Sequence, residues 1–433
     1  MVNSVQRYAW GSPIMLEQLR RGKPPGQPDD SESAGEAPEA ELWMGSHPRG
    51  PSTIVTSPGE RVPLRSHLVH NTAGALGARA VSLQPPGEEE PGLPFLFKIL
   101  TAEHALSIQS HPTRELATAG FRREEAAGSD RSARERNYRD QNHKPELVCA
   151  VGDFWGLRGF RPWPELGGEM DQFLELLGGS GDASVGAFST ELRTFVAAPG
   201  EDSWKRAFVS LLGLSGDRNA VATLCDAARR QAVREGNAGH GPAEERDSRY
   251  RWVLQLLDEY PNDLGALAPL YLNLVHLRRG EAMYLGAGVL HAYLYGAGVE
   301  IMANSDNVLR AGCTAKHIDP VELGRSLSFV PDVPEVIRPD PAEKAHRYET
   351  PAAEFELTTI PGAGRPIEVH KAEGPAIVLA LGGMVQVQQQ PEGAVISAAP
   401  TDSVFVDHET KTFTLRIADH ATAYVAALPG AIQ

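Results

Sequence analysis

The sequence has little of what marks membrane, secreted or disulfide-bonded proteins. No stretch of its 433 residues approaches the ~20 consecutive apolar residues of a membrane-spanning helix. Its three cysteines, Cys149, Cys225 and Cys313, are too few and too scattered for a disulfide framework or a cysteine-based zinc site. Residues 1–13 contain no apolar core of signal-peptide length. We therefore expect a cytoplasmic protein with reduced thiols.

Basic residues are also in deficit. There are 41 Lys and Arg against 56 Asp and Glu, which gives a formal net charge of −15. General nucleic-acid binding needs a basic face, so this balance argues against it. It does not exclude an anionic small molecule, because a few local Lys and Arg side chains can hold one phosphate against a negative background.

The pattern of apolar residues predicts three parts. These are a central β domain from residues 1–162 and 276–322, a helical insertion at 163–275, and a C-terminal β domain at 323–433. The central part has short apolar runs between frequent glycines and prolines, which is typical of strands and turns. The insertion has apolar residues at helical spacing, and we expect it to cover the cleft and exclude water.

The C-terminal part is predicted to be an all-β sandwich or jelly roll, since apolar and polar residues alternate in short segments such as 412–417. A proline-rich connector at 331–344 precedes it. The Gly382-Gly383 pair between two apolar segments predicts a tight hairpin. In the central part, the charged stretch 122–139 is expected to be an exposed loop or helix.

Three short segments carry side chains that bind metals. Gln109 and His111 are two residues apart in LSIQSHP, so on a strand they would face the same way. Glu146 lies in NHKPEL, and His291 follows a glycine-rich turn. Two imidazoles, a carboxylate and an amide oxygen make a plausible mixed site, and zinc accepts His and Glu readily. From spacing alone, ordinary buried or surface histidines remain the alternative, and glutamine is an unusual zinc ligand.

Longer blocks of sequence contain or accompany these segments. They are YAWGSP (8–13), ELWMGSHP (41–48), LPFLFKIL (93–100), LSIQSHP (106–112), NHKPEL (142–147), GLRGFRP (156–162), LYLNLVHL (270–277) and HAYLYGAGVEIMANSDNVLRAGCTAKHID (291–319). In these blocks and their order, the sequence resembles the type I phosphomannose isomerase family. The last block is long and specific, whereas the C-terminal third resembles the family in architecture only.

The resemblance implies a mainly β fold with an α-helical insertion, in which the central catalytic domain and the C-terminal domain are cupin-like jelly rolls. It implies a zinc-dependent aldose–ketose isomerase that interconverts mannose 6-phosphate and fructose 6-phosphate and supplies GDP-mannose synthesis. One Zn²⁺ ion per chain would be held by Gln109, His111, Glu146 and His291.

Further residues inside the matching blocks are candidates for catalysis. Arg310 would stabilise an enediolate or a phosphate oxygen. Lys144 and Glu300 are alternative bases for the proton transfer, and the sequence gives no choice between them. His143 is a candidate for opening the sugar ring. The candidates for holding the substrate or its phosphate are Ser107, Lys98, Lys316, Trp10 and Glu41. For each of these an ordinary ion pair or core position is the alternative.

Two other functions stay open at this point. A catalytically silent cupin-type protein that binds sugar phosphates would need the same pocket, but it would not need a complete acid–base set. A different cupin enzyme, such as an iron oxygenase, is disfavoured by Gln109 in place of a histidine ligand. We expect a monomer whose partner is a small sugar phosphate, with no nucleic acid and no membrane. Cys313, in the last block, predicts sensitivity to thiol reagents.

Overall fold

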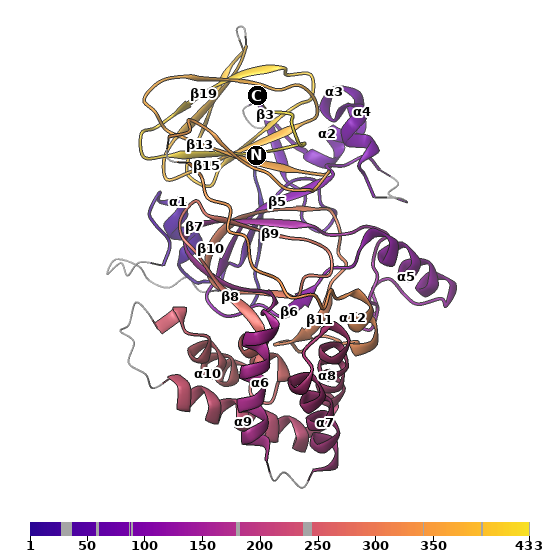
Figure 1. Cartoon of the computed structure of the whole chain (residues 1–433). Helices are drawn as coiled ribbons and strands as arrows, with labels where there is room; N and C mark the ends of the chain where they lie inside the picture. Colours follow the sequence, from indigo (N-terminus) through magenta and orange to yellow (C-terminus); the bar gives the residue numbers. More distant parts are fainter. Residues whose placement is uncertain are drawn as a thin grey trace.

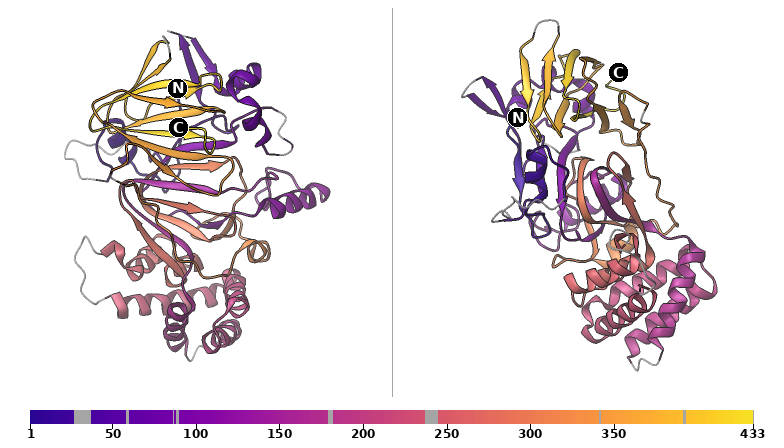
Figure 2. Two further views of the ribbon diagram at one scale, coloured as in Figure 1. Left: turned by 45° about the horizontal axis from the view of Figure 1, so that its top comes forward. Right: turned by 90° about the vertical axis from the view of Figure 1, so that its left-hand side faces the viewer.

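The computed structural model describes residues 1–26, 37–57, 60–85, 87, 90–178, 182–236, 245–340, 342–390 and 393–432. Figure 1 shows three layers, with the central strands in the middle, a group of helices below them and the C-terminal strands above. The two other views in Figure 2 show the same order of layers. Among the described residues, no helix is long and apolar enough to cross a membrane.

The middle layer is one nine-stranded sheet. Its strands are β1 (Ser4–Gln6), β2 (Glu41–Met44), β5 (Phe95–Ala102), β6 (Ile108–Ser110), β7 (Glu146–Phe160), β8 (Leu272–Leu277), β9 (Ala282–Leu285), β10 (His291–Ala303) and β11 (Leu309–Gly312). The long strand β10 pairs with β5 and β6 and also with β7, which in turn pairs with β8 and β9. A separate ribbon contains β3 (Thr53–Ser57) and β4 (Glu60–Pro63). The helices beside the sheet are α1 (Met15–Arg20), α2 (Leu64–His70), α3 (Thr72–Ala75), α4 (Gly77–Ser82), α5 (Arg114–Ala126) and α12 (Pro320–Ser326).

This sheet is strongly curled. Glu146 pairs with Met302 near one end of β10, and His291 begins the other end. Along a flat strand these positions would be on the order of 35 Å apart. Yet Glu146 Oε2 lies 3.5 Å from His291 Nε2. The sheet therefore closes over its own face, and the mainly β, cupin-like fold with a helical region is confirmed.

The curl coincides with irregular pairing between β7 and β10. Their register shifts twice, between Tyr293 and Tyr295 and again between Gly296 and Gly298. Such irregularities bend strands and increase their twist. At Gly296, where φ is +116°, a Cβ atom would lie 2.4 Å from the carbonyl oxygen of Asp153. Only glycine fits this close approach of the two backbones.

The lower layer is helical. It contains α6 (Trp163–Leu177), α7 (Ala183–Ala197), α8 (Glu201–Gly213), α9 (Arg218–Gly236), α10 (Arg249–Glu259) and α11 (Ala268–Tyr271), with short 3₁₀ turns η1 (Leu214–Gly216), η2 (Glu245–Asp247) and η3 (Leu264–Leu267). Phe160 at the end of β7 packs edge-on against Trp204 and Phe208 of α8, which joins this layer to the sheet. Strand β8 begins at Leu272, inside the range expected to be helical, and it pairs with β7.

The upper layer, called the C-terminal domain from here on, contains two sheets. The five-stranded sheet has the order β12-β13-β20-β15-β18, and the four-stranded sheet has the order β14-β19-β16-β17. The strands are β12 (His346–Tyr348), β13 (Glu356–Pro361), β14 (Ile367–His370), β15 (Ala376–Leu381), β16 (Val385–Gln389), β17 (Val395–Ala398), β18 (Ser403–Val406), β19 (Thr412–Ile417) and β20 (Thr422–Ala427). In the connector before them, Ile337 forms a single β-bridge with Ala282.

The predicted hairpin at Gly382-Gly383 is wrong. Strand β15 already has neighbours on both edges, β18 and β20, so it has no free edge for β16. The two glycines instead carry the chain from one sheet to the other, and Gly382 makes the turn with φ at +75°. The strand predicted over 412–417 is confirmed, and its apolar residues Phe413, Leu415 and Ile417 are all buried.

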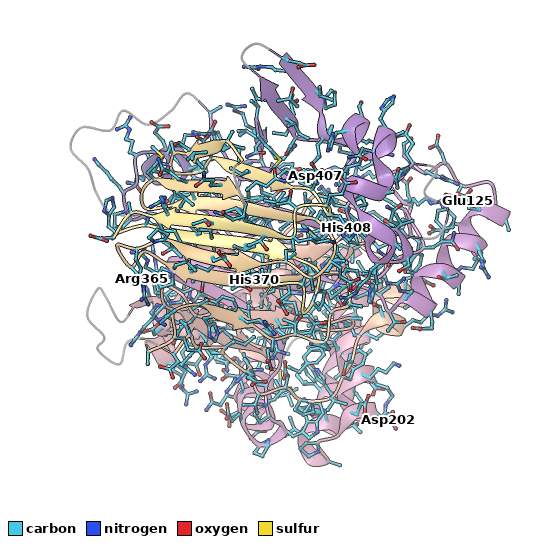
Figure 3. All side chains as sticks on the ribbon, turned by 90° about the horizontal axis from the view of Figure 1, so that it is seen from above. Glu125, Asp202, Arg365, His370, Asp407 and His408 are labelled. Carbon is cyan, nitrogen blue, oxygen red and sulfur yellow. The ribbon has the colours of Figure 1, made fainter. Side chains whose placement is uncertain are left out.

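The C-terminal domain docks on helices α2–α4. The backbone N–H of His408 donates to the carbonyl of Ala75, and His67 Nε2 lies 2.7 Å from Asp407 Oδ1. Figure 3, seen from above, shows Asp407 and His408 where the C-terminal strands meet these helices. One hydrophobic core continues across this boundary, so the two layers pack as one unit.

A buried lysine lies near the same boundary. Lys371 is 2% exposed, and its ammonium donates to the carbonyls of Gly374 at 2.6 Å and His408 at 3.1 Å. Burial, with a smaller contribution from the charge of Lys411, lowers the pKa of Lys371 from 10.5 to about 8.

We predict that this lysine makes stability rise with pH. The unfolded chain binds more protons than the folded protein between pH 8 and 10.5, so the free energy of unfolding should increase across that window. Below pH 8, Lys371 is protonated in both the folded and the unfolded protein, so its contribution to stability no longer changes with pH. Denaturant unfolding should show that the free energy of unfolding increases more between pH 7 and pH 10 in the parent than in Lys371→Met. Lys344→Met, at an exposed position, controls for the loss of a lysine. Equal gains in the parent and Lys371→Met would contradict the prediction.

Candidate active site

A cavity of about 610 Å³ opens beside the curled sheet. Strands β2, β5, β6, β7, β10 and β11 all contribute to its lining, together with the segment that follows α5. Its cationic residues are Arg49, Lys98, Arg134, Arg136, Arg139, Lys144, Arg310 and Lys316, and its acidic residues are Glu41, Glu146, Glu300 and Asp306. Cations outnumber acids in this cavity although the chain carries a net charge of −15. The cavity is therefore suited to an anionic ligand.

Three potential metal ligands meet beside this cavity. His111 Nε2 lies 3.3 Å from Glu146 Oε1, and His291 Nε2 lies 3.5 Å from Glu146 Oε2. All the ligand atoms are within 4.8 Å of one another. The two histidines are fully buried, and the cluster adjoins the cavity through Glu146 and Gln109.

Hydrogen bonds to backbone carbonyls orient both imidazoles. His111 Nδ1 lies 2.8 Å from the carbonyl of Asn307, and His291 Nδ1 lies 2.9 Å from the carbonyl of Val289. A proton on each Nδ1 leaves each Nε2 with a free lone pair that faces Glu146. Burial lowers the pKa of His111 to about 4, which keeps this imidazole neutral as a metal ligand must be.

The residues fit a divalent metal ion. His111 Nε2 and Glu146 Oε2 are buried without a hydrogen-bond partner among the described residues, which is costly unless something else binds them. The amide of Gln109 lies 3.5 Å from His291 Nε2, and a half-turn of this amide would aim its oxygen at the same point. Two imidazoles and a carboxylate suit zinc, and the amide oxygen supplies the expected fourth donor.

A buried network of charges lines the cavity on the neighbouring strands. Lys98 Nζ lies 2.9 Å from Glu41 Oε1 and 2.5 Å from Glu300 Oε2, and the Tyr293 hydroxyl donates to Glu300 Oε1 at 2.6 Å. Burial alone would lower the pKa of Lys98, but Glu300 and Glu41 raise it above its usual value. Burial raises the pKa of Glu300, while Lys98 opposes the rise. Lys98 therefore stays protonated and holds the two carboxyl groups.

The other sequence-predicted residues are distributed as follows. Lys144 lines the cavity, with Nζ 3.0 Å from Glu146 Oε1. Ser107 lines it beside β6, and Trp10 lines it while stacking on Tyr8 at 5.5 Å between ring centroids. Arg310 and Lys316 line it as well. These positions agree with a role in binding or catalysis.

Two predicted roles do not agree with the geometry. His143 is not among the residues that line the cavity, because its imidazole lies 2.7 Å from Glu354 of the C-terminal domain. Ring opening is therefore not assigned to it. Cys313 does line the cavity, but burial raises the pKa of its thiol well above the usual value. This suppresses the reactive thiolate and argues against the expected sensitivity to thiol reagents.

A concentration of positive charge remains without an acidic partner. In the part of the chain that the structure describes, neither Arg310 nor Lys316 forms an ion pair, and the guanidinium of Arg139 donates only to the carbonyls of Arg131 and Ala133. Burial, and then the charge of Arg139, lowers the pKa of Arg310. Burial and the neighbouring arginines likewise lower the pKa of Lys316. These cations lie close enough to repel one another, as expected of groups that await an anion.

The stretch 122–139 supplies several of these cations, a role that the sequence did not predict. Most of it is exposed, as expected, including Arg134 and Arg139. Near its end the Tyr138 ring packs over Gly120, where a Cβ would be 2.3 Å from the ring. Arg134, Arg136 and Arg139 from this end also line the cavity. The arginine-rich run RSARERNYR (131–139) was the available signal.

Other lining residues were also not predicted. Asp306 lies 2.5 Å from Arg49 and 3.6 Å from His47, and all three line the cavity. From the helical layer, Tyr260 reaches the lining, and its hydroxyl donates to the carbonyl of Ala105. Tyr260, at the end of α10, thus adds one residue of the helical layer to the edge of the cavity.

Comparison with known proteins agrees with this geometry. The family model for the catalytic domain of type I phosphomannose isomerase matches residues 1–163. The chain is 40% identical over 331 residues to mannose-6-phosphate isomerase of Salmonella typhimurium, which covers 76% of this chain and 75% of the relative. The chain belongs to the type I phosphomannose isomerase family. The human mannose-6-phosphate isomerase is 32% identical over 410 residues, covering 92% of this chain and 88% of the relative.

Solved structures of the phosphomannose isomerase family have the same fold. A zinc-bound mannose 6-phosphate isomerase superposes with a TM-score of 0.79 at 31% identity, covering 99% of this chain and 98% of the other. A mutant of the Salmonella typhimurium enzyme gives a TM-score of 0.80 over the same shares of the two chains, also at 31% identity. The similarity therefore includes the helical layer and the C-terminal domain.

We predict that His291→Ala abolishes stoichiometric binding of Zn²⁺, because the substitution removes one ligand atom of a buried site. Equilibrium dialysis followed by metal analysis measures the bound ion. His276→Ala is the matched control, since His276 is a partly exposed histidine of β8 that pairs with Asp153 and Asp247. It should bind zinc as the parent does. Unchanged binding by His291→Ala would place the metal elsewhere.

Proposed function

We propose that this chain is a zinc-dependent aldose–ketose isomerase that interconverts D-mannose 6-phosphate and D-fructose 6-phosphate by proton transfer through an enediol. The observation that carries the proposal is the buried cluster of His111, Glu146 and His291, whose free ligand atoms adjoin a cavity rich in cations. An isomerase of this kind needs both parts, a group that polarises the sugar oxygens and a place for the phosphate. The relatives that are named mannose-6-phosphate isomerases support the same assignment.

One zinc ion would be held by Gln109, His111, Glu146 and His291. When bound there, zinc would act as a Lewis acid that polarises the carbonyl of the open-chain sugar without any redox step. The protein contributes the orientation of the ligands, through the carbonyls of Asn307 and Val289 that receive the Nδ1 protons.

The geometry favours Glu300 as the group that moves the proton between C1 and C2. Its carboxyl is buried at the cavity, and burial raises its pKa toward the range in which a carboxyl can both accept and donate a proton, although Lys98 opposes the rise. Lys98 and Tyr293 hold the two carboxyl oxygens at 2.5 Å and 2.6 Å. Lys144, whose ammonium lies beside Glu146, is the second candidate.

We assign the phosphate to the cations that lack acidic partners. Arg310 and Lys316 lie on β11 and on the loop directly after it, and Arg139 lies on the segment after α5, so two separate pieces of the chain supply cations to the cavity. Burial, and then repulsion by neighbouring cations, lowers the pKa of Arg310 and Lys316, and a bound phosphate would relieve this repulsion. Ser107, Trp10 and Glu41 would bound the sugar itself.

The proposal also includes the division into a central catalytic domain, a helical insertion and a C-terminal domain. It includes a cytoplasmic monomer without nucleic-acid partners. The three cysteines are free thiols, which suits a reducing compartment. The exposed large apolar side chains of the described chain are mostly single valines spread over many elements, which gives little surface for a stable oligomer.

The first prediction of this proposal concerns the reaction and the metal together. Purified protein should form fructose 6-phosphate from mannose 6-phosphate in a coupled assay, lose this activity after chelation and recover it on addition of zinc. Loss and recovery are expected because the donor set fits zinc and the reaction needs a polarised carbonyl. A folded, zinc-loaded protein without turnover would instead support the silent sugar-phosphate binder.

The second prediction concerns the phosphate. Arg139→Met should raise KM for mannose 6-phosphate roughly tenfold or more, since a hydrogen bond to a charged group is lost, and should change kcat much less. Steady-state kinetics in both directions measures the two constants. Arg122→Met is the control, because Arg122 is an exposed arginine of the same stretch and does not line the cavity. A KM for Arg139→Met equal to that of the control would remove Arg139 from the phosphate site.

A further inference from the structure

A carboxylate of the C-terminal domain reaches the segments that bear the proposed metal ligands. Glu354 lies between β12 and β13 and is completely buried. Its Oε1 lies 2.7 Å from His143 Nε2 and 2.5 Å from Arg114 Nη2. Arg114 and His143 also touch each other at 2.9 Å. One carboxylate thus joins two residues that are far from it along the chain.

The two residues that Glu354 contacts flank ligands on both sides of the site. Arg114 is the first residue of α5, three residues after His111. His143 stands three residues before Glu146, the first residue of β7. Of the two ligands, His111 follows a strand of only three residues, and residues 127–145 before Glu146 contain no helix or strand. Local secondary structure therefore holds these ligands weakly at one end, and tertiary contacts supply the rest. On the side of β10 and β11 these include the backbone hydrogen bonds from Gly288 to His111 and from Ala303 to Pro145.

A second contact of the C-terminal domain falls on the same strand. The Tyr348 hydroxyl of β12 donates to the carbonyl of Gly280 at 2.6 Å and lies 3.3 Å from the Cys149 sulfur of β7. Glu146 and Cys149 are three residues apart on β7. The C-terminal domain thus contacts β7 just after Glu146, at Cys149, and the segment just before Glu146, at His143.

We infer that Glu354 is a positioning residue, which holds the segments of His111 and Glu146 at the spacing that a metal ion requires. This inference rests on the metal site of the proposed function, and it gives the C-terminal domain a part in that site although none of its residues lines the cavity in the described structure. Glu354 does not touch the ligands; it acts through Arg114 and His143. Its second oxygen, Oε2, has no hydrogen-bond partner among the described residues, so Oε1 makes both contacts.

The charge of Glu354 supports this role. Burial would raise the pKa of its carboxyl, but the hydrogen bond with His143 and the charges of His143 and Arg114 hold the pKa below its usual value. Glu354 is thus an anion at neutral pH. Replacement of Glu354 by glutamine keeps the shape of the side chain and removes the negative charge that binds Arg114. The buried amide and the groups around it then lack a charged hydrogen-bond partner.

The test compares zinc affinity in Glu354→Gln, Glu356→Gln and the parent. Competition with a fluorescent chelator gives the dissociation constant, and thermal unfolding of the metal-free proteins reports the fold. Glu356 is the matched control: it is a buried glutamate two residues away that pairs with Arg347 inside the C-terminal domain. We expect the zinc dissociation constant of Glu354→Gln to rise by up to about tenfold, the lower end of what losing a direct partner of a metal ligand costs, because Glu354 acts through Arg114 and His143. Glu356→Gln should bind zinc as the parent does. The metal-free melting temperatures of both variants should fall by similar amounts, because each variant loses a buried charged contact.

A further variant tests whether the contact acts as a unit. Arg114→Met should also weaken zinc binding, and the double variant with Glu354→Gln should lose less than the product of the two single losses. Arg114 is partly exposed, so this variant supplies the readout if Glu354→Gln does not accumulate as folded protein. Equal zinc affinity in Glu354→Gln, Glu356→Gln and the parent would overturn the inference. So would equal weakening in both glutamine variants, which would indicate a general loss of stability.

The same measurements separate this inference from the proposed function. A parent that isomerises mannose 6-phosphate, with a Glu354→Gln variant that binds zinc equally well, overturns the positioning role and leaves the function intact. A parent that binds zinc but does not isomerise overturns the proposed function, while the affinity difference between the variants still decides the positioning role. A parent that binds no zinc overturns both.

Discussion

The bend in β7 and β10 is the constraint on which the rest of the site depends. It brings Glu146 and His291 into contact although their positions along the paired strands are far apart. The bend requires two backbones to approach within a distance that only glycine allows, at Gly296. Once the sheet is curled, its inner face becomes a pocket, and several strands of the sheet place their side chains around the same cavity. A flat sheet with the same sequence would place the ligands on opposite ends.

The second organising feature is the distribution of charge. The chain as a whole is acidic, yet the cavity collects cations, and they are of two kinds. Lys98 is neutralised by Glu41 and Glu300, and it serves to hold these carboxyl groups. Arg310 and Lys316 have no such partner in the part of the chain that is described, and their charges remain available. In the free protein these cations repel one another, and each of them would attract an anion that enters the cavity. Folding and binding use the same residue types in different ways.

Local sequence pattern was enough to predict part of the fold and part of the candidate site. Strict alternation predicted the strand at 412–417, and the family blocks identified His111, Glu146 and His291, which the structure brings together. What the sequence could not show depends on contacts between distant segments. The Gly382-Gly383 turn has the composition of a hairpin, but the edges of β15 are taken by strands further along the chain. His143 has the chemistry of a ring-opening group, but Glu354, 211 residues away, binds its imidazole outside the cavity. Composition predicted the exposure of the stretch 122–139, but it could not show that Arg134, Arg136 and Arg139 line the cavity, which depends on contacts with distant segments.

The order of these segments along the chain has a consequence for synthesis. The last proposed ligand, His291, precedes Glu354 by residues 292 to 353, which contain the rest of β10, strand β11, helix α12, the connector and strand β12. At translation rates of about 5–20 residues per second, Glu354 is made roughly 3 to 13 s after the ligand set is complete. During that interval a nascent chain carries every donor atom, while Arg114 and His143 lack their contact with Glu354. With the positioning role proposed for Glu354, secure loading of the metal would therefore be a late event, which waits for a domain that lies outside the cavity.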